Sequence, residues 1–241
     1  MGDARPHLLV VGASSGIGRA VAERLSATHA ITAMARRADR LSDLETTIGI
    51  KAIACDVSNP ETFDAAITTA VAERGKLAAA VFCAGQQQIK PLRSLKATDI
   101  QSVLAVNLFA PLMLARAMAS QRVSEPNAVF CAVSSVAAQR PESGIVAYSV
   151  AKAGLDALIK GAAKELGPRR FVGVAPGWLD TEMTQAYKHV YGEEFRSALE
   201  KRSPAGIATV DAVVDTIEFL LGDKARHITG EIITVDGGAV L

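Results

Sequence analysis

The stretch Gly12-Ala13-Ser14-Ser15-Gly16-Ile17-Gly18 decides the fold of this chain. It follows an apolar run at residues 7–11, which predicts a strand, and opens an amphipathic segment at residues 16–27, which predicts a helix. Glycines in such a turn let the backbone approach a pyrophosphate, and the free N–H groups of the helix start attract its charge. The spacing GxxxGxG in this context predicts a nucleotide-binding turn. The alternative is a plain tight turn.

Outward from this turn, short apolar runs alternate with longer amphipathic segments. The predicted strands cover residues 7–11, 31–35, 51–54, 77–83, 127–133, 171–174 and 231–235. The predicted helices cover residues 16–27, 38–47, 58–74, 98–120, 148–166 and 209–221. This alternation predicts an α/β fold of the Rossmann type, doubly wound, with a seven-stranded parallel sheet and helices on both faces. No linker or repeat interrupts it, so we expect a single domain over residues 1–241.

One irregular region, at about residues 178–207, departs from the alternation. It carries four of the eleven Phe, Tyr and Trp residues of the chain, namely Trp178, Tyr187, Tyr191 and Phe195. That density is too high for a solvated connector. We therefore expect a short helical excursion that acts as a substrate lid.

Composition and charge exclude several classes of protein. The 241 residues carry a net charge of +1, which gives no electrostatic footprint for nucleic acid or for an anionic membrane. The three cysteines, Cys55, Cys83 and Cys131, are widely spaced, and no cluster with histidine predicts a metal site. Apolar runs are short and the first residues are polar, so we expect neither a membrane span nor a signal peptide, and a cytoplasmic location.

The end of the second predicted strand bears on the choice of cofactor. NAD-binding folds usually place an acidic residue there, to bind the ribose 2′-hydroxyl. This chain has Arg36 and Arg37 instead, and a guanidinium fork holds a 2′-phosphate. The pair favours NADP(H), the alternative being two arginines at a surface strand end. Asp56, followed by Val57, closes the third strand and is a candidate acceptor for the adenine amino group.

A candidate catalytic group lies in the second half of the chain. Tyr148 and Lys152 are four residues apart on one predicted helix and so share a face, and Ser135 follows the fifth strand. A tyrosine has an ordinary pKa of about 10, and a nearby ammonium together with a cationic nicotinamide lowers it. Tyr148 would then exchange a proton with a carbonyl oxygen that Ser135 holds. Alone, a YxxxK pair is weak, because such pairs occur on many solvated helices.

Taken together, these motifs resemble the short-chain dehydrogenase/reductase family. The resemblance extends from His7 to Gly238 and is greatest toward 3-oxoacyl-(acyl-carrier-protein) reductases. The motifs that carry it are the glycine turn, Asp56-Val57, Asn107, Ser135, Tyr148-Ser149-Val150-Ala151-Lys152, Pro176-Gly177, and the C-terminal segment from Ile228 to Gly238.

The resemblance implies a role for each matching residue. Ser135, Tyr148 and Lys152 would be the catalytic triad, Asn107 would hold a water linked to Lys152, and Lys152 would also bind the nicotinamide ribose. The residues implied in cofactor binding are Gly12, Ser14, Ser15, Gly16, Ile17, Gly18, Arg36, Arg37, Asp56, Val57, Ala84, Gly85, Tyr148, Lys152, Pro176, Gly177 and Thr181. The helix from Tyr148 to Leu166 would be a dimer face, and a homodimer or homotetramer is implied.

Some positions depart from the family pattern. The usual Asn-Asn-Ala-Gly is Phe82-Cys83-Ala84-Gly85, so the stabilising asparagines are missing. Residues 124–127 lack the basic residues that carrier-protein reductases often show, which weakens the case for an acidic carrier protein. Gln86-Gln87-Gln88 would either line the pocket mouth or form a polar loop.

We expect an NADPH-dependent carbonyl reductase that interconverts a ketone and a secondary alcohol, with a 3-oxoacyl thioester as the first choice of substrate. A sugar, polyol or cyclic ketone, with Lys90 and the glutamines near the entrance, is the second choice. A non-catalytic NADP-binding regulator is a third interpretation. All the triad positions are present, which argues against it.

Overall fold

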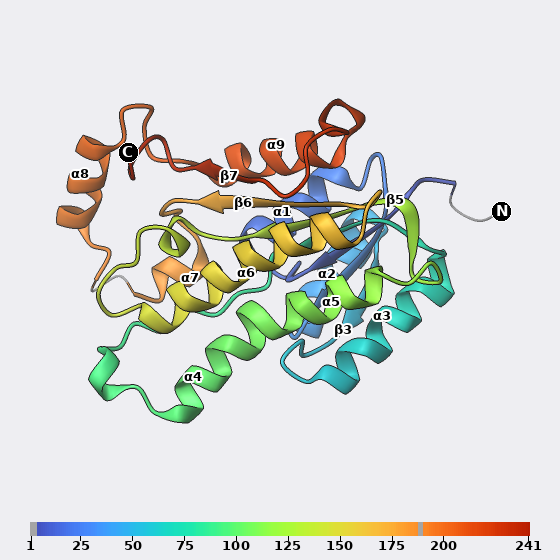
Figure 1. Ribbon diagram of the computed structural model, residues 1–241, viewed down its shortest axis with the longest axis horizontal. Coiled ribbons are helices and arrows are strands. Elements are labelled where there is room, and N and C mark those ends of the chain that lie inside the picture. The colour runs from blue at the N-terminus through green and yellow to red at the C-terminus, as the bar shows by residue number, and fades with distance from the viewer. Residues whose placement is uncertain (1–3, 188–189) are drawn as a thin grey trace.

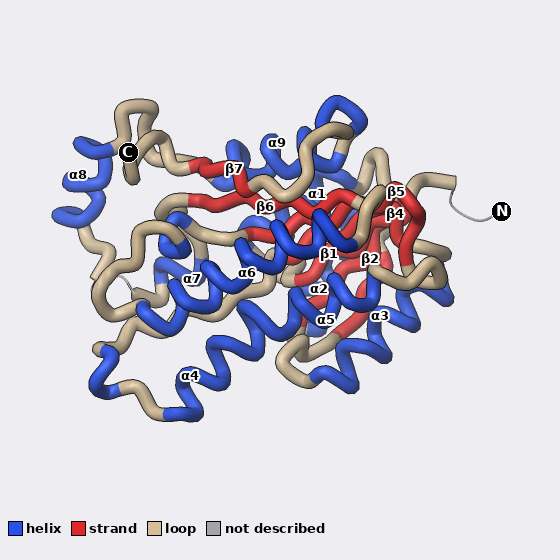
Figure 2. Tube along the Cα trace, viewed as in Figure 1, coloured by secondary structure: helices blue, strands red, loops and turns tan. Residues whose placement is uncertain are grey.

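The structure is a computed structural model that describes residues 4–187 and 190–241. Its sheet contains strands β1 (His7–Val11), β2 (Ala30–Ala35), β3 (Lys51–Ala54), β4 (Leu77–Phe82), β5 (Ser124–Val133), β6 (Arg170–Pro176) and β7 (Ile232–Val235). All neighbouring pairs are parallel, in the order β3-β2-β1-β4-β5-β6-β7. The predicted doubly wound, seven-stranded sheet is confirmed (Figure 2).

Helices cover both faces of the sheet (Figure 1). One layer contains α1 (Gly16–Leu25), α2 (Ala38–Ile48) and α9 (Val210–Leu221), and the other contains α3 (Pro60–Arg74), α4 (Ala97–Leu104), α5 (Ala110–Met118) and α6 (Val146–Glu165). Strand side chains point alternately to the two sides, so each face has its own core. Leu8 packs with Val21 and Ile217 on one side, and Leu9 packs with Phe63 and Leu155 on the other.

The strand order reverses between β1 and β4, since β2 and β3 lie on one side of β1 and β5, β6 and β7 lie beyond β4. In open α/β sheets the ligand crevice forms outside the carboxyl ends of the strands at such a point. The glycine turn follows β1 here, and Cys83-Ala84-Gly85 follows β4. The topology therefore brings the two segments together.

The helix predicted over residues 98–120 is interrupted. A π-helical turn at Ala105–Phe109 separates α4 from α5. Pro111 has no N–H, so the Asn107 carbonyl lacks its normal partner four residues ahead, and a regular α-helix cannot run through this point. The combined segment Ala97–Met118 is long and apolar enough to cross a membrane by length and composition. It packs on the sheet and on α3 and α6, as the core helix of an α/β domain does.

The irregular region contains two short helices, α7 (Glu182–Gln185) and α8 (Glu193–Arg202). They lie beyond the carboxyl ends of the strands, to the left of the sheet in Figure 1. Residues 188 and 189 of the predicted lid lie outside the described residues. The predicted helical excursion is confirmed for the rest of the region.

Candidate active site

One large cleft, with a volume of about 850 Å³, runs along the carboxyl ends of the strands. Its wall is continuous from Arg36 and Arg37 at one end, past the glycine turn, to Tyr148 and Lys152. The size is typical of pockets that enclose a cofactor or a drug-sized ligand. All the sequence-predicted cofactor and triad residues line it, and the exception among the predicted site residues is Asn107, which lies behind the wall.

The glycines of the turn have two distinct reasons to be glycine. Gly12 has a φ of +92°, and a Cβ there would lie 2.5 Å from the Ala84 backbone nitrogen. A Cβ on Gly18 would collide with the Gly12 carbonyl. These two positions are thus required by the packing of the turn itself. A Cβ on Gly16 would make only ordinary contact with Thr181, and the φ of +53° is what favours glycine there.

The Arg37 side chain holds the glycine turn from the β2 side. Its Nε and Nη2 donate to Ser14 Oγ at 3.2 and 3.0 Å, and Nη2 also donates to Ser15 Oγ at 2.7 Å. Arg36 is more exposed and forms no hydrogen bond with the described residues. The structure therefore separates the two arginines, because only Arg37 is tied to the turn.

Two further charged residues, Arg40 and Glu182, lie beside Arg37, and no motif in the sequence singles them out. Arg37 Nη1 lies 2.8 Å from Glu182 Oε2 of α7, and Arg40 of α2 pairs with the other oxygen of Glu182. Hydrogen bonds from both arginines lower the pKa of Glu182 to about 2, so it is charged at neutral pH. Glu182 is more than 140 residues from either arginine in sequence, and such a contact leaves no local pattern.

Asp56 lies two residues after the end of β3, in the wall of the cleft. Its Oδ1 accepts hydrogen bonds from the backbone N–H of Ser58 at 2.9 Å and from its hydroxyl at 2.8 Å. One carboxylate oxygen is thereby engaged in a local turn. The second oxygen is available for a donor from outside the chain.

Lys152 is buried, with 3 % of its surface exposed, and Nζ donates to the Val133 carbonyl at 2.7 Å. Burial lowers the pKa of Lys152 to about 8. Asp156, one helical turn further along α6, is also buried and accepts a hydrogen bond from Ser134 Oγ at 2.5 Å. Asp156 is not among the residues predicted from the sequence, although its i, i+4 spacing from Lys152 places both side chains on one face of the helix.

Tyr148 lies beside Lys152, whose Nζ is 5.6 Å from the centre of its ring. Burial raises the pKa of Tyr148 to about 12, and a hydrogen bond with Ser135 only partly offsets this. The lowering of this pKa by Lys152 together with a bound nicotinamide stays a prediction. The ammonium group is directed at the Val133 carbonyl rather than at the phenol oxygen.

Ser135 is the N-cap of a short 3₁₀ turn, and its Oγ accepts a hydrogen bond from Ala137 N at 3.2 Å. Its hydroxyl proton is thus still able to donate toward the cleft. Asn107 is fully buried in the π-helical turn: Nδ2 donates to the carbonyls of Gln86 and Val103, both at 2.8 Å, and Oδ1 accepts from Gln86 N at 3.2 Å. Its side chain braces the loop after β4. Any water bound at Asn107 would need its main-chain carbonyl.

The glutamine run after β4 forms hydrogen bonds with the region at residues 178–207 and with α4. Gln87 Nε2 donates to the Tyr191 hydroxyl at 3.1 Å, and the Gln87 carbonyl accepts from Tyr187 at 2.9 Å. Gln88 donates to Asp99 at 3.2 Å, and Lys90 forms an ion pair with the same carboxylate at 2.6 Å. Gln86 and Gln87 also line the cleft. The run therefore both lines the cleft and forms a polar loop.

The four aromatic side chains of the region at residues 178–207 line the cleft. Trp178, Tyr191 and Phe195 form a cluster with ring centroids 5.0 to 6.4 Å apart. Aromatic rings at these separations pack favourably. They give the wall around Tyr148 a large apolar surface, with the charged Arg140 and Glu142 at its border.

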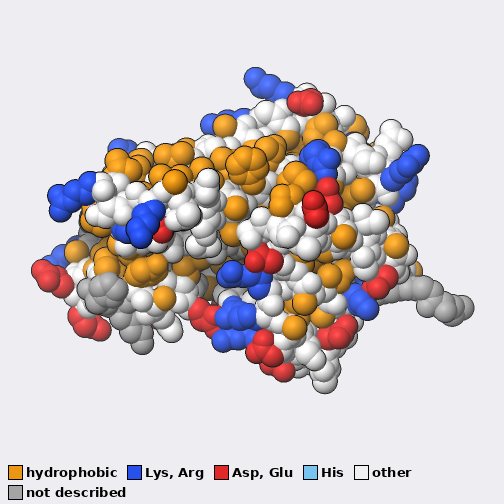
Figure 3. Space-filling model, turned by 90° about the horizontal axis from the view of Figure 1, so that it is seen from below, with side chains coloured by type: hydrophobic (Ala, Val, Ile, Leu, Met, Phe, Trp, Pro, Cys, Tyr) orange, Lys and Arg blue, Asp and Glu red, His pale blue; other side chains and the backbone are white. Residues whose placement is uncertain are grey.

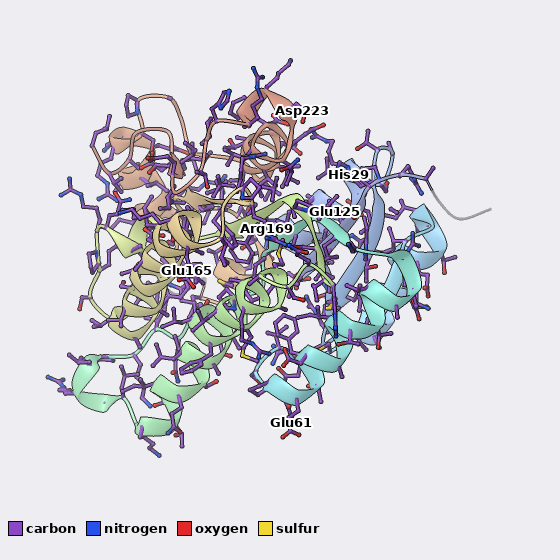
Figure 4. All side chains as sticks on the ribbon, turned by 45° about the vertical axis from the view of Figure 1, so that its right-hand side comes forward. His29, Glu61, Glu125, Glu165, Arg169 and Asp223 are labelled. Atoms are coloured by element: carbon purple, nitrogen blue, oxygen red, sulfur yellow. The ribbon has the colours of Figure 1, made fainter. Side chains whose placement is uncertain are left out.

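Two departures from the family pattern have visible consequences. Cys83 lies beside Gly18, where a Cβ would be 3.1 Å from the Cys83 Cβ, and burial raises the pKa of the thiol. At the start of β5, Glu125 is exposed, while Arg169 is buried and its Nε donates to Ser124 Oγ at 2.8 Å (Figure 4). Arg169 is thus not available as a surface cation. In residues 4–187 and 190–241, no group of three His, Cys, Asp or Glu side chains is placed to hold a metal.

A glycine turn at a switch point, connected by one cleft to a Ser, Tyr and Lys cluster, defines the class of nicotinamide-dependent oxidoreductases. Residues 12–240 match the family described as enoyl-(acyl carrier protein) reductase. An uncharacterized oxidoreductase, YmfI of Bacillus subtilis (strain 168), is 30% identical over 95% of this chain and 97% of its own length. The 3-oxoacyl-(acyl-carrier-protein) reductase FabG of Escherichia coli (strain K12) is 30% identical over 95% of both chains.

The comparison with solved structures points to the same class of protein. The chain is similar to 4-hydroxyisoleucine dehydrogenase complexed with NADH, with a TM-score of 0.88, 26% identity, and 98% and 99% of the two chains covered. It is also similar to the aldohexose dehydrogenase AldT of Thermoplasma acidophilum, with a TM-score of 0.89, 26% identity, and 98% and 94% covered. The chain belongs to the short-chain dehydrogenase/reductase family. It is an oxidoreductase of alcohol and carbonyl groups, and its family uses a nicotinamide cofactor.

Proposed function

We propose that the protein is an NADP(H)-dependent carbonyl reductase that interconverts a ketone and a secondary alcohol. The observation that carries the proposal is the single cleft joining Arg37 and the glycine turn to Ser135, Tyr148 and Lys152. The cradle fits a dinucleotide: Gly12 and Gly16 turn the backbone, α1 points its N-terminus at the cleft, and Arg37 lies at the adenosine end.

A nicotinamide supplies the hydride when bound. The residues of this chain handle the oxygen and its proton. Tyr148, whose pKa is raised to about 12, is protonated at neutral pH and donates its proton to the carbonyl oxygen. Ser135 donates a hydrogen bond to the same oxygen, and the Lys152 ammonium stabilises the phenolate that remains. In this proposal the remaining cofactor contacts come from Ser14, Ile17, Val57, Pro176 and Thr181, which line the same wall.

The substrate we propose first is a 3-oxoacyl thioester, supported by the FabG relative and by the aromatic wall of Trp178, Tyr187, Tyr191 and Phe195. Residues 178–207 would act as its lid within a single domain. The exposed Glu125 at the start of β5 disfavours an acidic carrier protein as the donor, because like charges repel (Figure 4).

A sugar, polyol or cyclic ketone is the second candidate. The similarity to aldohexose dehydrogenase and the amide side chains of Gln86 and Gln87 in the cleft favour it. Lys90 contributes less than the sequence suggested, because its ammonium is paired with Asp99. Activity measured with a panel of 3-oxoacyl thioesters, aldoses, polyols and cyclic ketones distinguishes the two candidate substrate classes.

The decisive measurement follows the loss of NADPH absorbance with this panel, for wild type and for Tyr148→Phe. We expect Tyr148→Phe to lower kcat/KM by about 10²–10⁴-fold, because the proton donor is lost. Tyr187→Phe is the matched control: it removes another hydroxyl of the cleft, one that donates to the Gln87 carbonyl, and should lose far less. Full ketone reduction by Tyr148→Phe contradicts the proposal.

We also propose that the protein is a cytoplasmic homo-oligomer. Phe109 and Leu112 at the junction of α4 and α5, and Val150 of α6, are 46–58 % exposed. A band of apolar side chains crosses the surface in the view of Figure 3. Large exposed apolar patches mark association surfaces. Light scattering after size exclusion measures the mass, and a monomer of 25.2 kDa would contradict this proposal.

A further inference from the structure

The lid is attached to the adenosine end of the cleft by one carboxylate. Glu182 opens α7, directly after Thr181, and the chain enters the aromatic cluster four residues earlier at Trp178. Its two oxygens pair with Arg37 at the end of β2 and with Arg40 of α2. Within the described residues, no other ion pair joins the lid helices to the β2–α2 region.

The Arg37 side chain, which pairs with Glu182, also contacts the glycine turn. Of the Arg37 guanidinium, Nε and Nη2 contact Ser14 and Ser15 and only Nη1 contacts Glu182. A guanidinium fork and two serine hydroxyls are a donor set that suits a phosphate as well as a carboxylate. Because a phosphate and a carboxylate carry like charge, they cannot share one arginine pair without repelling each other.

We propose that Glu182 is a cofactor-specificity residue: its carboxylate competes with the 2′-phosphate of NADP(H) for Arg37 and Arg40, so that NADP(H) detaches α7 from the β2–α2 region and NAD(H) leaves it attached. This inference rests on the proposed function for the identity of the cofactor. It adds a coupling between the adenosine end of the cleft and the lid.

The ion pairs of Glu182 with Arg37 and Arg40 are weak enough for a phosphate to displace the carboxylate. The Arg37 and Glu182 side chains are 40% and 46% exposed, and ion pairs at such positions contribute little to stability. A bound phosphate dianion replaces the carboxylate with a larger charge on the same donors. Glu182 remains charged throughout the neutral range, because its pKa is lowered to about 2 by both arginines. The carboxylate therefore competes at full charge across the neutral range.

The test uses two fragments that differ in one group, adenosine 2′,5′-bisphosphate and 5′-AMP, titrated calorimetrically into the full chain. We expect Glu182→Gln to bind the bisphosphate about 3- to 10-fold more tightly than wild type, with 5′-AMP affinity changed less than twofold. Glu193→Gln is the matched control. It removes an exposed carboxylate from the first turn of α8, where no described residue forms an ion pair with it, and should change neither affinity.

Trp178, the one tryptophan of the chain, reports on the lid. We expect the bisphosphate, and not 5′-AMP, to change its fluorescence in wild type, and Glu182→Gln to show the changed spectrum before any addition. Unchanged or weaker bisphosphate binding by Glu182→Gln overturns the inference. A wild-type chain that binds neither fragment refutes the proposed nucleotide-dependent function instead, so the two failures are distinguishable.

Discussion

The two ends of the cleft are built from different kinds of interaction. At the end where we propose that the adenosine binds, Arg37, Arg40 and Glu182 form ion pairs that are about 40% exposed. At the catalytic end, Lys152 and Asn107 are buried, and their polar groups are bonded to the chain itself. Exposed ion pairs are weak and exchangeable, whereas buried polar groups are costly to disturb. In the function that we propose, the adenosine end can therefore adjust cofactor choice, while the catalytic end fixes the chemistry.

The largest expected effect is at the catalytic end. Lys152→Met should lower kcat/KM for ketone reduction by about 10²–10⁴-fold, because the ammonium that stabilises the Tyr148 phenolate is lost. Steady-state kinetics with NADPH measure this. Lys160→Met is the control, since Lys160 is exposed on the same helix two turns further on and should retain wild-type activity. Comparable losses in both variants would mean that the effect is structural.

The same residue gives a prediction for stability against pH. Burial holds the pKa of Lys152 near 8 in the folded chain, below its ordinary value of 10.5. Between pH 8 and pH 10.5, Lys152 is mostly protonated in the unfolded chain and mostly neutral in the folded chain. Because the unfolded chain binds more protons, the free energy of unfolding rises with pH. From about pH 7.5 to about pH 9.5 wild type should gain on the order of 2 kcal/mol relative to Lys152→Met. Urea unfolding of both proteins at the two pH values measures it.

If the two proteins respond equally to pH, then Lys152 is not desolvated in the folded chain. The buried character of the catalytic end would then be wrong, and with it the contrast with the adenosine end. The comparison with Lys152→Met is needed because other groups also titrate in this range, and they contribute equally to both proteins.

Sequence reasoning succeeded where local periodicity and topology decide the outcome. The alternation of apolar runs and amphipathic segments fixed the parallel sheet, and the switch point then brought the segments after β1 and β4 together. Boundaries were less accurate: β5 begins at Ser124 rather than at residue 127. The break at residues 105–109 was missed, although Pro111 removes the N–H that a continuous helix needs.

The electrostatics of the site were the least accessible from sequence. The Glu182 contacts join residues far apart in the chain, and exposed ion pairs follow no periodic pattern. The protonation of Tyr148 depends on burial and on where Lys152 points, since the ammonium bonds to the Val133 carbonyl. Spacing places two side chains on one face of a helix, but it does not give the direction of a flexible lysine.

The smallest expected effect is at the adenosine end, and it separates two arginines that the sequence treats alike. Arg37 is hydrogen-bonded to Ser14 and Ser15, whereas Arg36 contacts neither. Arg37→Gln should therefore weaken NADPH binding by about tenfold, and Arg36→Gln by no more than about threefold, because a free guanidinium must be ordered before it can bind. Binding of NADH should change less than about twofold in both variants, since it has no 2′-phosphate. Isothermal titration with the two cofactors measures all four ratios. Equal losses for the two variants would mean that net charge near the strand end, rather than the geometry of the turn, selects the cofactor.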